Sequence, residues 1–414
     1  MIERFVENNL LEALNDTPVV LIHGSRQCGK TTLAQLVGNK LGYYYLTFDD
    51  ANQLNAAKID PVGFIDNLPE KVIIDEVQRA PEIFTSIKAS VDKNRKPGRF
   101  ILTGSSNVLL LPRLSDSLAG RIEVIHLRAL SQAEIIGEQS SVMLNIFSRT
   151  LNQNIKTTGY TKLGKKLNTL ITSGGYPSAL NRTSENRKMA WYRDFINTLI
   201  QRDIKDIANI QNVSILPKLL QLCASQTARL FNVSDLAAPF SLSRPTIKEY
   251  ITLLEQIFLV EQIQPWHTNR LSRLIKTPKL HLSDTGLACS LLNVKNDDLE
   301  KDRNLIGQLL ETYVYQELRK YASWQDGNVD IYHFRNKDKV EVDFVIQDGR
   351  YITGVEVKAS ATIQLSDFKG LIKLRDALDD NFANGVVFYD GEAILSFGDR
   401  LFAIPYAAFL ANNA

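Results

Sequence analysis

The stretch TPVVLIHGSRQCGKTTLAQLV (residues 17–37) decides the fold, because it joins an apolar strand to a glycine-rich loop and the start of a helix. The loop matches the spacing G-x-x-x-x-G-K-[ST] in full, with Gly24, Gly29, Lys30 and Thr31 at the defining positions. Glycines there let backbone N–H groups close around phosphate oxygens, and the helix start adds its dipole. We therefore expect this loop to bind the phosphates of a nucleotide, most naturally ATP.

Two side chains of this loop have specific expected roles. Lys30 should reach the β- and γ-phosphates, and the Thr31 hydroxyl should hold Mg²⁺. A chance match to a short pattern is the alternative, but the flanking strand and helix argue against it. The other loop residues expected to line the nucleotide are Ser25, Arg26, Gln27, Cys28 and Thr32.

The segment KVIIDEVQRAP (71–81) adds an acidic pair at the end of an apolar strand. In open α/β sheets, ligands bind at the carboxyl ends of the strands. Asp75 therefore suits Mg²⁺ coordination, and Glu76 suits polarising the attacking water. Such a pair is usually only a solvated loop, but the phosphate loop upstream favours a catalytic role.

Further strands are expected at YYYLTFDD (43–50), RFILTGSS (99–106) and RIEVIHLRALS (121–131). Strands that alternate with helical stretches predict an α/β fold with a parallel sheet. The second of these strands ends in small polar residues, where a group that senses the γ-phosphate would lie.

Composition is typical of an ordinary globular protein. The 414 residues are 44% hydrophobic and 23% charged, with a net charge of +2, which excludes a polycationic nucleic-acid coater and an acidic disordered chain. The three cysteines and five histidines show no metal-ligand spacing. The N-terminus lacks the apolar core of a signal peptide, and no apolar run approaches the ~20 residues that span a bilayer. We expect a cytoplasmic protein with no membrane partner.

Residues 1–210 resemble the AAA-type ATPases, with the ATPase domain at 1–135 and a helical lid at 136–210. The resemblance implies that Ser105, or its neighbour Ser106, senses the γ-phosphate. It also places an arginine finger at Arg121, before the fifth strand, which would act on a neighbouring subunit and require a homo-oligomer. The alternative for Arg121 is a surface arginine that caps a helix.

Residues 211–295 are predicted to form three short helices followed by a β-hairpin, the order of a winged helix-turn-helix that binds DNA. Between 241 and 282 six basic residues stand against three glutamates, which favours phosphate contacts. The alternative is an ordinary solvated face, because such segments often serve only in packing between domains. The six are Arg244, Lys248, Arg270, Arg273, Lys276 and Lys279.

The segment KVEVDFVIQDGRYITGVEVKAS (339–360) reads as two strands joined at Asp348-Gly349. Alternation would place Glu341 and Asp343 on one face, beside Glu356 on the returning strand. Like charges that face each other destabilise a sheet unless a cation lies between them. The alternative is a half-exposed hairpin with its charges in water.

Glu311 in a preceding helix, then Asp343, then Glu356-x-Lys358 is the residue order of the PD-(D/E)XK nucleases, which residues 296–414 resemble. The resemblance implies that Asp343 and Glu356 hold Mg²⁺, with Glu311 and Lys358 completing a nuclease site. The proline of the family name is absent, since Val342 precedes the aspartate. The order of all these parts resembles a group of prokaryotic AAA-type ATPases with a C-terminal PD-(D/E)XK-like domain.

Two functions remain open at this point. One is an ATPase that acts on DNA, with a restriction-endonuclease-like α/β domain that could cut it with Mg²⁺. The other is a nucleotide-driven signalling switch that binds a protein partner and uses the nuclease-like domain only for docking.

Overall fold

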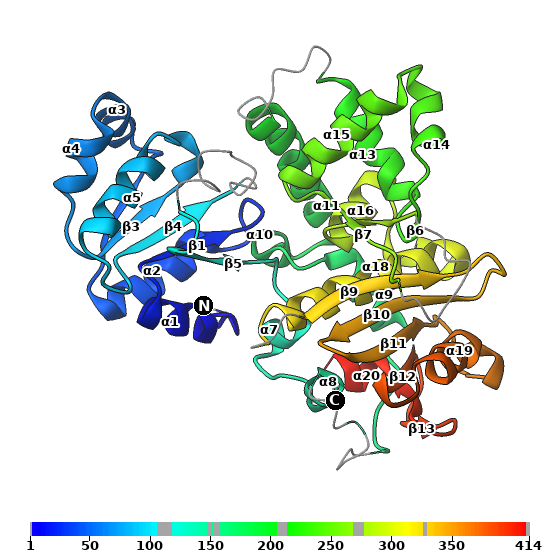
Figure 1. The fold of residues 1–414 in the computed structure, drawn as a ribbon. Coiled ribbons are helices and arrows are strands. Elements are labelled where there is room, and N and C mark those ends of the chain that lie inside the picture. Colours follow the sequence, from blue (N-terminus) through cyan, green and yellow to red (C-terminus); the bar gives the residue numbers. More distant parts are fainter. Residues whose placement is uncertain are drawn as a thin grey trace.

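The computed structural model describes residues 2–105, 118–147, 151, 157–204, 213–267, 277–325 and 329–410 (Figure 1). Ser106, Arg270, Arg273 and Lys276 lie outside the described residues, so the roles expected for them stay predictions. Within the described ranges, none of the helices combines the length and apolar composition needed to cross a membrane.

A five-stranded parallel sheet forms the N-terminal part, with the strand order β2-β3-β4-β1-β5. Its register aligns Val19 with both Phe100 and Ile122, so the carboxyl ends of the central strands meet at one edge. This confirms the predicted parallel α/β sheet. The strands are β1 (Val19–His23), β2 (Tyr44–Thr47), β3 (Val72–Asp75), β4 (Phe100–Gly104) and β5 (Ile122–His126).

Helices cover both faces of this sheet. One face packs against α1 (Glu7–Asp16) and α2 (Lys30–Leu41). The other packs against α3 (Ala51–Ile59), α4 (Pro61–Asp66) and α5 (Ile83–Lys93). Because both faces are covered, every residue of β1 is buried, which explains its continuous apolar sequence.

Helices dominate the next part of the chain. Among them, α9, α11 and α13 pack around α16. They are α7 (Gln132–Ile136), α8 (Ser141–Phe147), α9 (Lys165–Ser173), α10 (Pro177–Leu180), α11 (Glu185–Thr198), the π-helical turn η3 (Leu199–Asp203), α13 (Ile215–Ser225), α14 (Val233–Ala237), α15 (Arg244–Gln256), α16 (Thr285–Leu292) and α17 (Asn296–Lys301).

A small antiparallel sheet accompanies α13, α14 and α15, with the order β6-β8-β7. Its strands are β6 (Arg229–Leu230), β7 (Val260–Ile263) and β8 (Lys279–Leu282). Ser243 caps α15 by accepting a hydrogen bond from the Thr246 N–H, and Pro245 lies in the first turn. Three helices and a hairpin thus occur in the expected order.

The C-terminal part is a six-stranded sheet, β13-β14-β12-β11-β10-β9. The long helix α18 (Arg303–Ala322) packs on one face and α19 (Lys369–Leu378) on the other. The remaining elements are β9 (Val329–Arg335), β10 (Glu341–Asp348), β11 (Tyr351–Val357), β12 (Phe382–Tyr389), β13 (Leu395–Ser396), β14 (Leu401–Pro405) and α20 (Tyr406–Phe409).

One cluster of buried hydrophobic side chains extends from Ala129 to Leu410. It joins residues on both sides of the boundaries expected near 210 and 295. In particular, α8 packs against α20, so a helix of the expected lid contacts the C-terminal part directly. The division into lid, middle segment and C-terminal domain stays a prediction, and these parts share one core.

Candidate functional site

The glycine-rich loop lies at the carboxyl edge of the parallel sheet, between β1 and α2. Gly24, Gln27 and Gly29 have φ values of 154°, 60° and 105°. A Cβ atom at Gly24 would collide with the carbonyl oxygen of Leu127, so this position requires glycine. Because α2 begins at Lys30, the N–H groups of its first turn face the loop. This arrangement suits phosphate binding.

Lys30 is buried beneath the loop. Its Nζ donates hydrogen bonds to the carbonyl oxygens of Gly24 and Ser25, at 3.0 Å and 2.9 Å. Cys28 is also buried, and its Sγ lies 3.3 Å from the carbonyl oxygen of Leu127, so this small side chain fills the base of the loop. The ammonium is therefore held beside the expected phosphate positions.

Thr31 and Asp75, the expected Mg²⁺ pair, lie in contact. Thr31 Oγ1 donates to Asp75 Oδ1 at 2.8 Å, and Tyr45 Oη donates to Asp75 Oδ2 at 3.1 Å. Thr103 from β4 also donates to Asp75. Burial, followed by the Asp75 charge, raises the pKa of Tyr45 to about 12, so this phenol stays protonated as a donor. Hydroxyl and carboxylate oxygens are ligands that Mg²⁺ prefers, so the pair fits the ion.

Glu76 follows in a left-handed conformation, with a φ of 60°. Its Oε2 accepts hydrogen bonds from Ser105 Oγ, at 3.0 Å, and from Gln78 Nε2. Gln78 Nε2 also lies 2.9 Å from Ser105 Oγ. Sequence reasoning missed Gln78, whose place two residues after Glu76 is the only signal. Together Gln78 and Ser105 fix the carboxylate that is expected to polarise water.

Replacing Glu76 with glutamine should lower kcat for ATP about 100-fold while ATP affinity changes little. The amide keeps the shape of the side chain but cannot accept a proton from water. Steady-state hydrolysis and calorimetric nucleotide binding check the two expectations. The matched control is Glu70→Gln, because Glu70 pairs with Lys96 on the surface. An unchanged kcat would contradict the role of Glu76 in polarising the attacking water.

A cavity of about 960 Å³ opens over the loop. Its lining includes loop residues 26–32, Glu76 and residues of α10, so a helix of the expected lid covers the same space. Arg4 also lines it and donates to the carbonyl oxygens of Cys28, at 2.8 Å, and Arg128, at 2.7 Å. Arg4 was missed, because nothing in the N-terminal sequence marks it. The cavity is large enough for a nucleotide.

Two arginines with expected roles form ion pairs within the chain. Arg26 Nε lies 3.6 Å from Asp203 Oδ1 in the turn after α11, and this ion pair links the loop to the expected lid. Arg121 precedes β5 at the sheet edge opposite the loop, and it forms two contacts with Asp92, at 2.7 Å and 3.1 Å. The ion pair gives Arg121 a structural role, and the finger function in a neighbouring subunit stays a prediction.

A group of aromatic rings connects the loop to the middle segment. His23, the residue before Gly24, packs against His126 and Phe258, with ring centroids 4.7 Å and 5.6 Å away. Phe258 follows α15 in a left-handed conformation. Burial, then Arg128 and Lys30, lowers the pKa of His23 to about 4, so the imidazole is neutral at pH 7.

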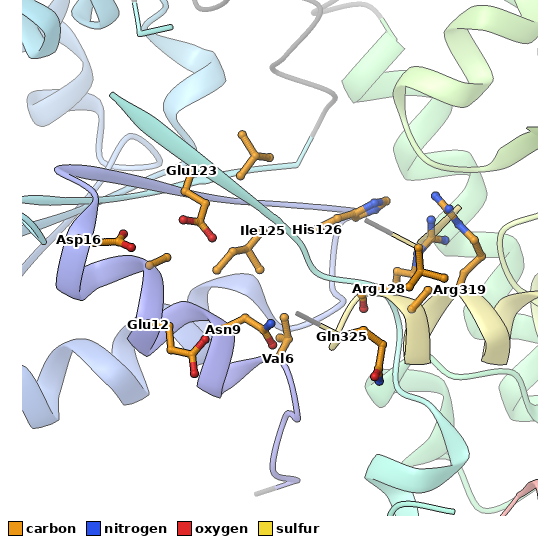
Figure 2. A pocket seen from close by; sticks show the side chains of 15 residues that line it. Val6, Asn9, Glu12, Asp16, Glu123, Ile125, His126, Arg128, Arg319 and Gln325 are labelled. Carbon is orange, nitrogen blue, oxygen red and sulfur yellow. The ribbon is translucent and has the colours of Figure 1, made fainter. Parts of the chain in front are cut away.

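Next to these rings, Arg128 crosses to the small sheet. Its guanidinium contacts both carboxylate oxygens of Glu261 on β7, one of them at 3.2 Å, and Tyr315 donates to the same carboxylate at 3.0 Å. Figure 2 shows Arg128, Arg319 and His126 at one end of a cavity of about 570 Å³ between α1, β5 and α18. The loop and the small sheet are thus joined by packing and by charge.

The C-terminal sheet and α18 bring together the four residues of the predicted nuclease site. Glu311 comes from α18, Asp343 from β10, and Glu356 from β11, with Lys358 just after it. Lys358 Nζ lies 3.2 Å from Glu356 Oε2, and the Val357 N–H donates to Asp343 Oδ2 at 3.0 Å. We call Glu311, Asp343, Glu356 and Lys358 the carboxylate cluster.

Lys279 lies inside this cluster, so its predicted place on a DNA-binding surface is wrong. Its side chain is 4% exposed, and its Nζ contacts Glu311 Oε1 at 2.8 Å and Asp343 Oδ1 at 3.3 Å. Lys279 opens the strand KLHL, which is buried throughout. A charge in such a strand needs a charged partner.

The register of β10 and β11 corrects two further expectations. Asp348 pairs with Tyr351, so the turn is Gly349-Arg350 rather than Asp348-Gly349. Glu341 does not lie opposite Glu356, because the register that pairs Phe344 with Val355 continues to bring Asp343 opposite Glu356. Glu341 instead pairs with Arg335 of β9 at 3.1 Å, partly in solvent. The cluster therefore has one carboxylate fewer than the alternation suggested.

Burial and mutual repulsion disturb the titration of the cluster. Burial, then Asp343, raises the pKa of Glu311 to about 8, and the same causes raise the pKa of Glu356 well above its usual value. Burial alone would lower the pKa of Lys279, but the negative charges of Glu311 and Asp343 outweigh burial and raise this pKa. Across the described ranges, no three His, Cys, Asp or Glu residues are arranged to hold a metal ion. Lys279 contacts Asp343, one of the two residues expected to hold Mg²⁺, and the Mg²⁺ expected at Asp343 and Glu356 stays a prediction.

Comparison with known families divides the chain into three matches. Residues 16–136 match a model described as an AAA domain. Residues 164–298 and 306–409 match two models that are each described as a domain of unknown function (DUF8612 and DUF4143).

Similar proteins extend along almost the whole chain. An uncharacterized protein of Mycobacterium tuberculosis is 28% identical over 408 residues, which cover 98% of this chain and 84% of that protein. An uncharacterized protein of Methanocaldococcus jannaschii is 24% identical over 393 residues, which cover 90% and 82%. Among solved structures, the Walker-type ATPase of Pyrococcus abyssi has a TM-score of 0.45 and 15% identity, and the match covers 70% of this chain and 96% of that one.

Proposed function

We propose that this chain, in which residues 16–136 form an AAA-type P-loop ATPase domain, couples Mg²⁺-dependent ATP hydrolysis to the binding of DNA by its middle segment. The observation that carries the proposal is the contact between His23, which adjoins the loop, and Phe258, which follows α15. A nucleotide that moves the loop would act on the helix expected to bind DNA.

For hydrolysis, the chain supplies each group that phosphoryl transfer requires. Lys30 would leave the carbonyl oxygens of Gly24 and Ser25 to contact the β- and γ-phosphates. Thr31 and Asp75 would hold Mg²⁺, which neutralises charge on these phosphates. Glu76, fixed by its neighbours, would orient the attacking water and accept its proton.

For DNA binding, support comes from the exposed face of α15. Arg244, Lys248 and Thr252 are exposed there, while Ile247 and Ile251 face the core. Three helices followed by a hairpin is the order in which the third helix enters the major groove. Because Lys279 is buried in the carboxylate cluster, phosphate contacts within the described residues would depend on Arg244 and Lys248.

Replacing both Arg244 and Lys248 with alanine should flatten the dependence of log K on log salt by about 2, because each residue neutralises about one phosphate. Fluorescence anisotropy of a labelled duplex over a salt series measures this slope. Lys93→Ala, on the ATPase surface, is the matched control. Equal slopes in all three proteins would contradict DNA contact by α15.

The experiment that tests the whole proposal is ATP hydrolysis with and without duplex, single-stranded and branched DNA. Stimulation by one of these forms supports it. Hydrolysis that ignores DNA would favour the second candidate, a nucleotide-driven switch that binds a protein partner. Lys279 occupies the carboxylate cluster, which favours a C-terminal part that docks a partner without cutting DNA. We therefore do not propose cleavage.

A further inference from the structure

We propose that Lys279 is the resident cation of the carboxylate cluster and keeps divalent metal ions out of it. The ammonium contacts Glu311 and Asp343, and the nuclease resemblance makes Asp343 one of the two metal ligands. This inference does not depend on DNA binding or on ATP hydrolysis. It concerns the contacts that hold together the buried carboxylates of Asp343 and Glu356 and the partly buried carboxylate of Glu311.

Four of the six carboxylate oxygens of Glu311, Asp343 and Glu356 are already engaged. Lys279 contacts Glu311 Oε1 and Asp343 Oδ1, and the Val357 N–H donates to Asp343 Oδ2. Lys358 contacts Glu356 Oε2. A small divalent cation needs several oxygens at about 2.1 Å, and it would have to share these oxygens with an ammonium of the same sign. Metal binding therefore requires the Lys279 side chain to leave.

The backbone around Lys279 is fixed to the C-terminal sheet. On the β7 side, the Trp266 N–H donates to the carbonyl oxygen of His333 at 2.7 Å, and Trp266 Nε1 donates to Gln347 at 3.0 Å. On the β8 side, His333 Nε2 lies 3.0 Å from the carbonyl oxygen of Thr277, two residues before Lys279. Both arms of the hairpin are thus tied to β9 or β10, which delivers the lysine to the cluster.

This arrangement makes Lys279 a positioning residue that docks the small sheet onto the C-terminal domain. The same small sheet contacts Arg128 of the ATPase part through Glu261. A divalent cation and the docked hairpin would then compete for one set of carboxylates. The cluster could accept a metal only when β8 is withdrawn or its lysine is removed.

The test is Mn²⁺ binding to the full chain without nucleotide, measured by electron paramagnetic resonance of the free ion. Asp343→Asn identifies binding at the cluster, because a site on Thr31 and Asp75 is insensitive to it. We expect equal Mn²⁺ binding by the wild type and Asp343→Asn. We expect Lys279→Met to gain one site, and Lys279→Met/Asp343→Asn to lose it again.

Thermal unfolding gives a second readout. Lys279→Met should have a lower Tm, and Mn²⁺ should raise this Tm by more than it raises the Tm of the wild type or of the charge-preserving Lys279→Arg. An Mn²⁺ site in the wild type that Asp343→Asn removes would overturn the proposal. So would a folded Lys279→Met chain that gains no site. If Lys279→Met does not fold, comparing Mn²⁺ binding by the wild type and by Asp343→Asn still shows whether the wild-type cluster holds the ion.

Discussion

Replacing Lys30 with alanine should lower kcat/KM for ATP by at least about 100-fold, as expected when a main transition-state charge stabiliser is removed. Gly24 and Ser25 hold the buried ammonium beside the loop, from which it can reach the expected phosphate positions. A coupled-enzyme assay of phosphate release in excess Mg²⁺ measures the loss.

The control for this prediction is Lys93→Ala, which removes an exposed lysine that pairs with Asp66 on the surface of the ATPase domain. Its rate should match that of the wild type. Hydrolysis that survives in Lys30→Ala at more than about a tenth of the wild-type rate would contradict the assignment of the phosphate loop.

The second large effect concerns folding. Arg128→Ala should lower the free energy of unfolding by about 3 kcal/mol, because it removes the nearest cation from the largely buried Glu261 carboxylate. Tyr315 and Arg319, whose Nε lies 3.9 Å from Glu261 Oε2, would remain beside it. Arg128 is 8% exposed as a side chain, and both carboxylate oxygens of Glu261 contact it. Urea unfolding monitored by circular dichroism gives the difference, provided that the transition has a single step.

Arg121→Ala is the matched control, because the Arg121–Asp92 pair has similar geometry but lies partly in solvent, with side chains 25% and 36% exposed. Its loss should cost less than about 1 kcal/mol. If both substitutions lower the free energy of unfolding equally, burial does not make the Arg128–Glu261 contact more stabilising than a surface ion pair.

The nucleotide site was largely predictable because its residues follow short local patterns. Lys30 and Thr31 begin a helix directly after the loop, and Asp75 ends a strand. In a parallel sheet, the carboxyl ends of the strands lie at one edge, so these positions come together independently of the rest of the chain. Arg4 and Gln78 escaped prediction, because their contacts depend on where the N-terminus and a short turn pack.

The carboxylate cluster was predictable only in part. Its four expected members come from one helix and one hairpin, which are close in sequence. Lys279 comes from another sheet, 64 positions before Asp343, and no local pattern reports that pairing. Glu341 was misplaced because the predicted register assumed a turn at Asp348-Gly349, whereas Asp348 pairs with Tyr351 and the turn is one residue later.

The continuous core from Ala129 to Leu410 has a consequence for how the chain can be divided. A fragment that ends before α18 would leave the inner faces of α9 and α16 without their partner and expose apolar surface to water. A break on the ATPase side would instead leave this core whole, because the buried clusters of residues 6–127 are separate from it, and would sever contacts such as those of Arg128 with Glu261 and of His23 with Phe258. The protein should therefore yield two autonomous pieces on limited digestion rather than one for each family match.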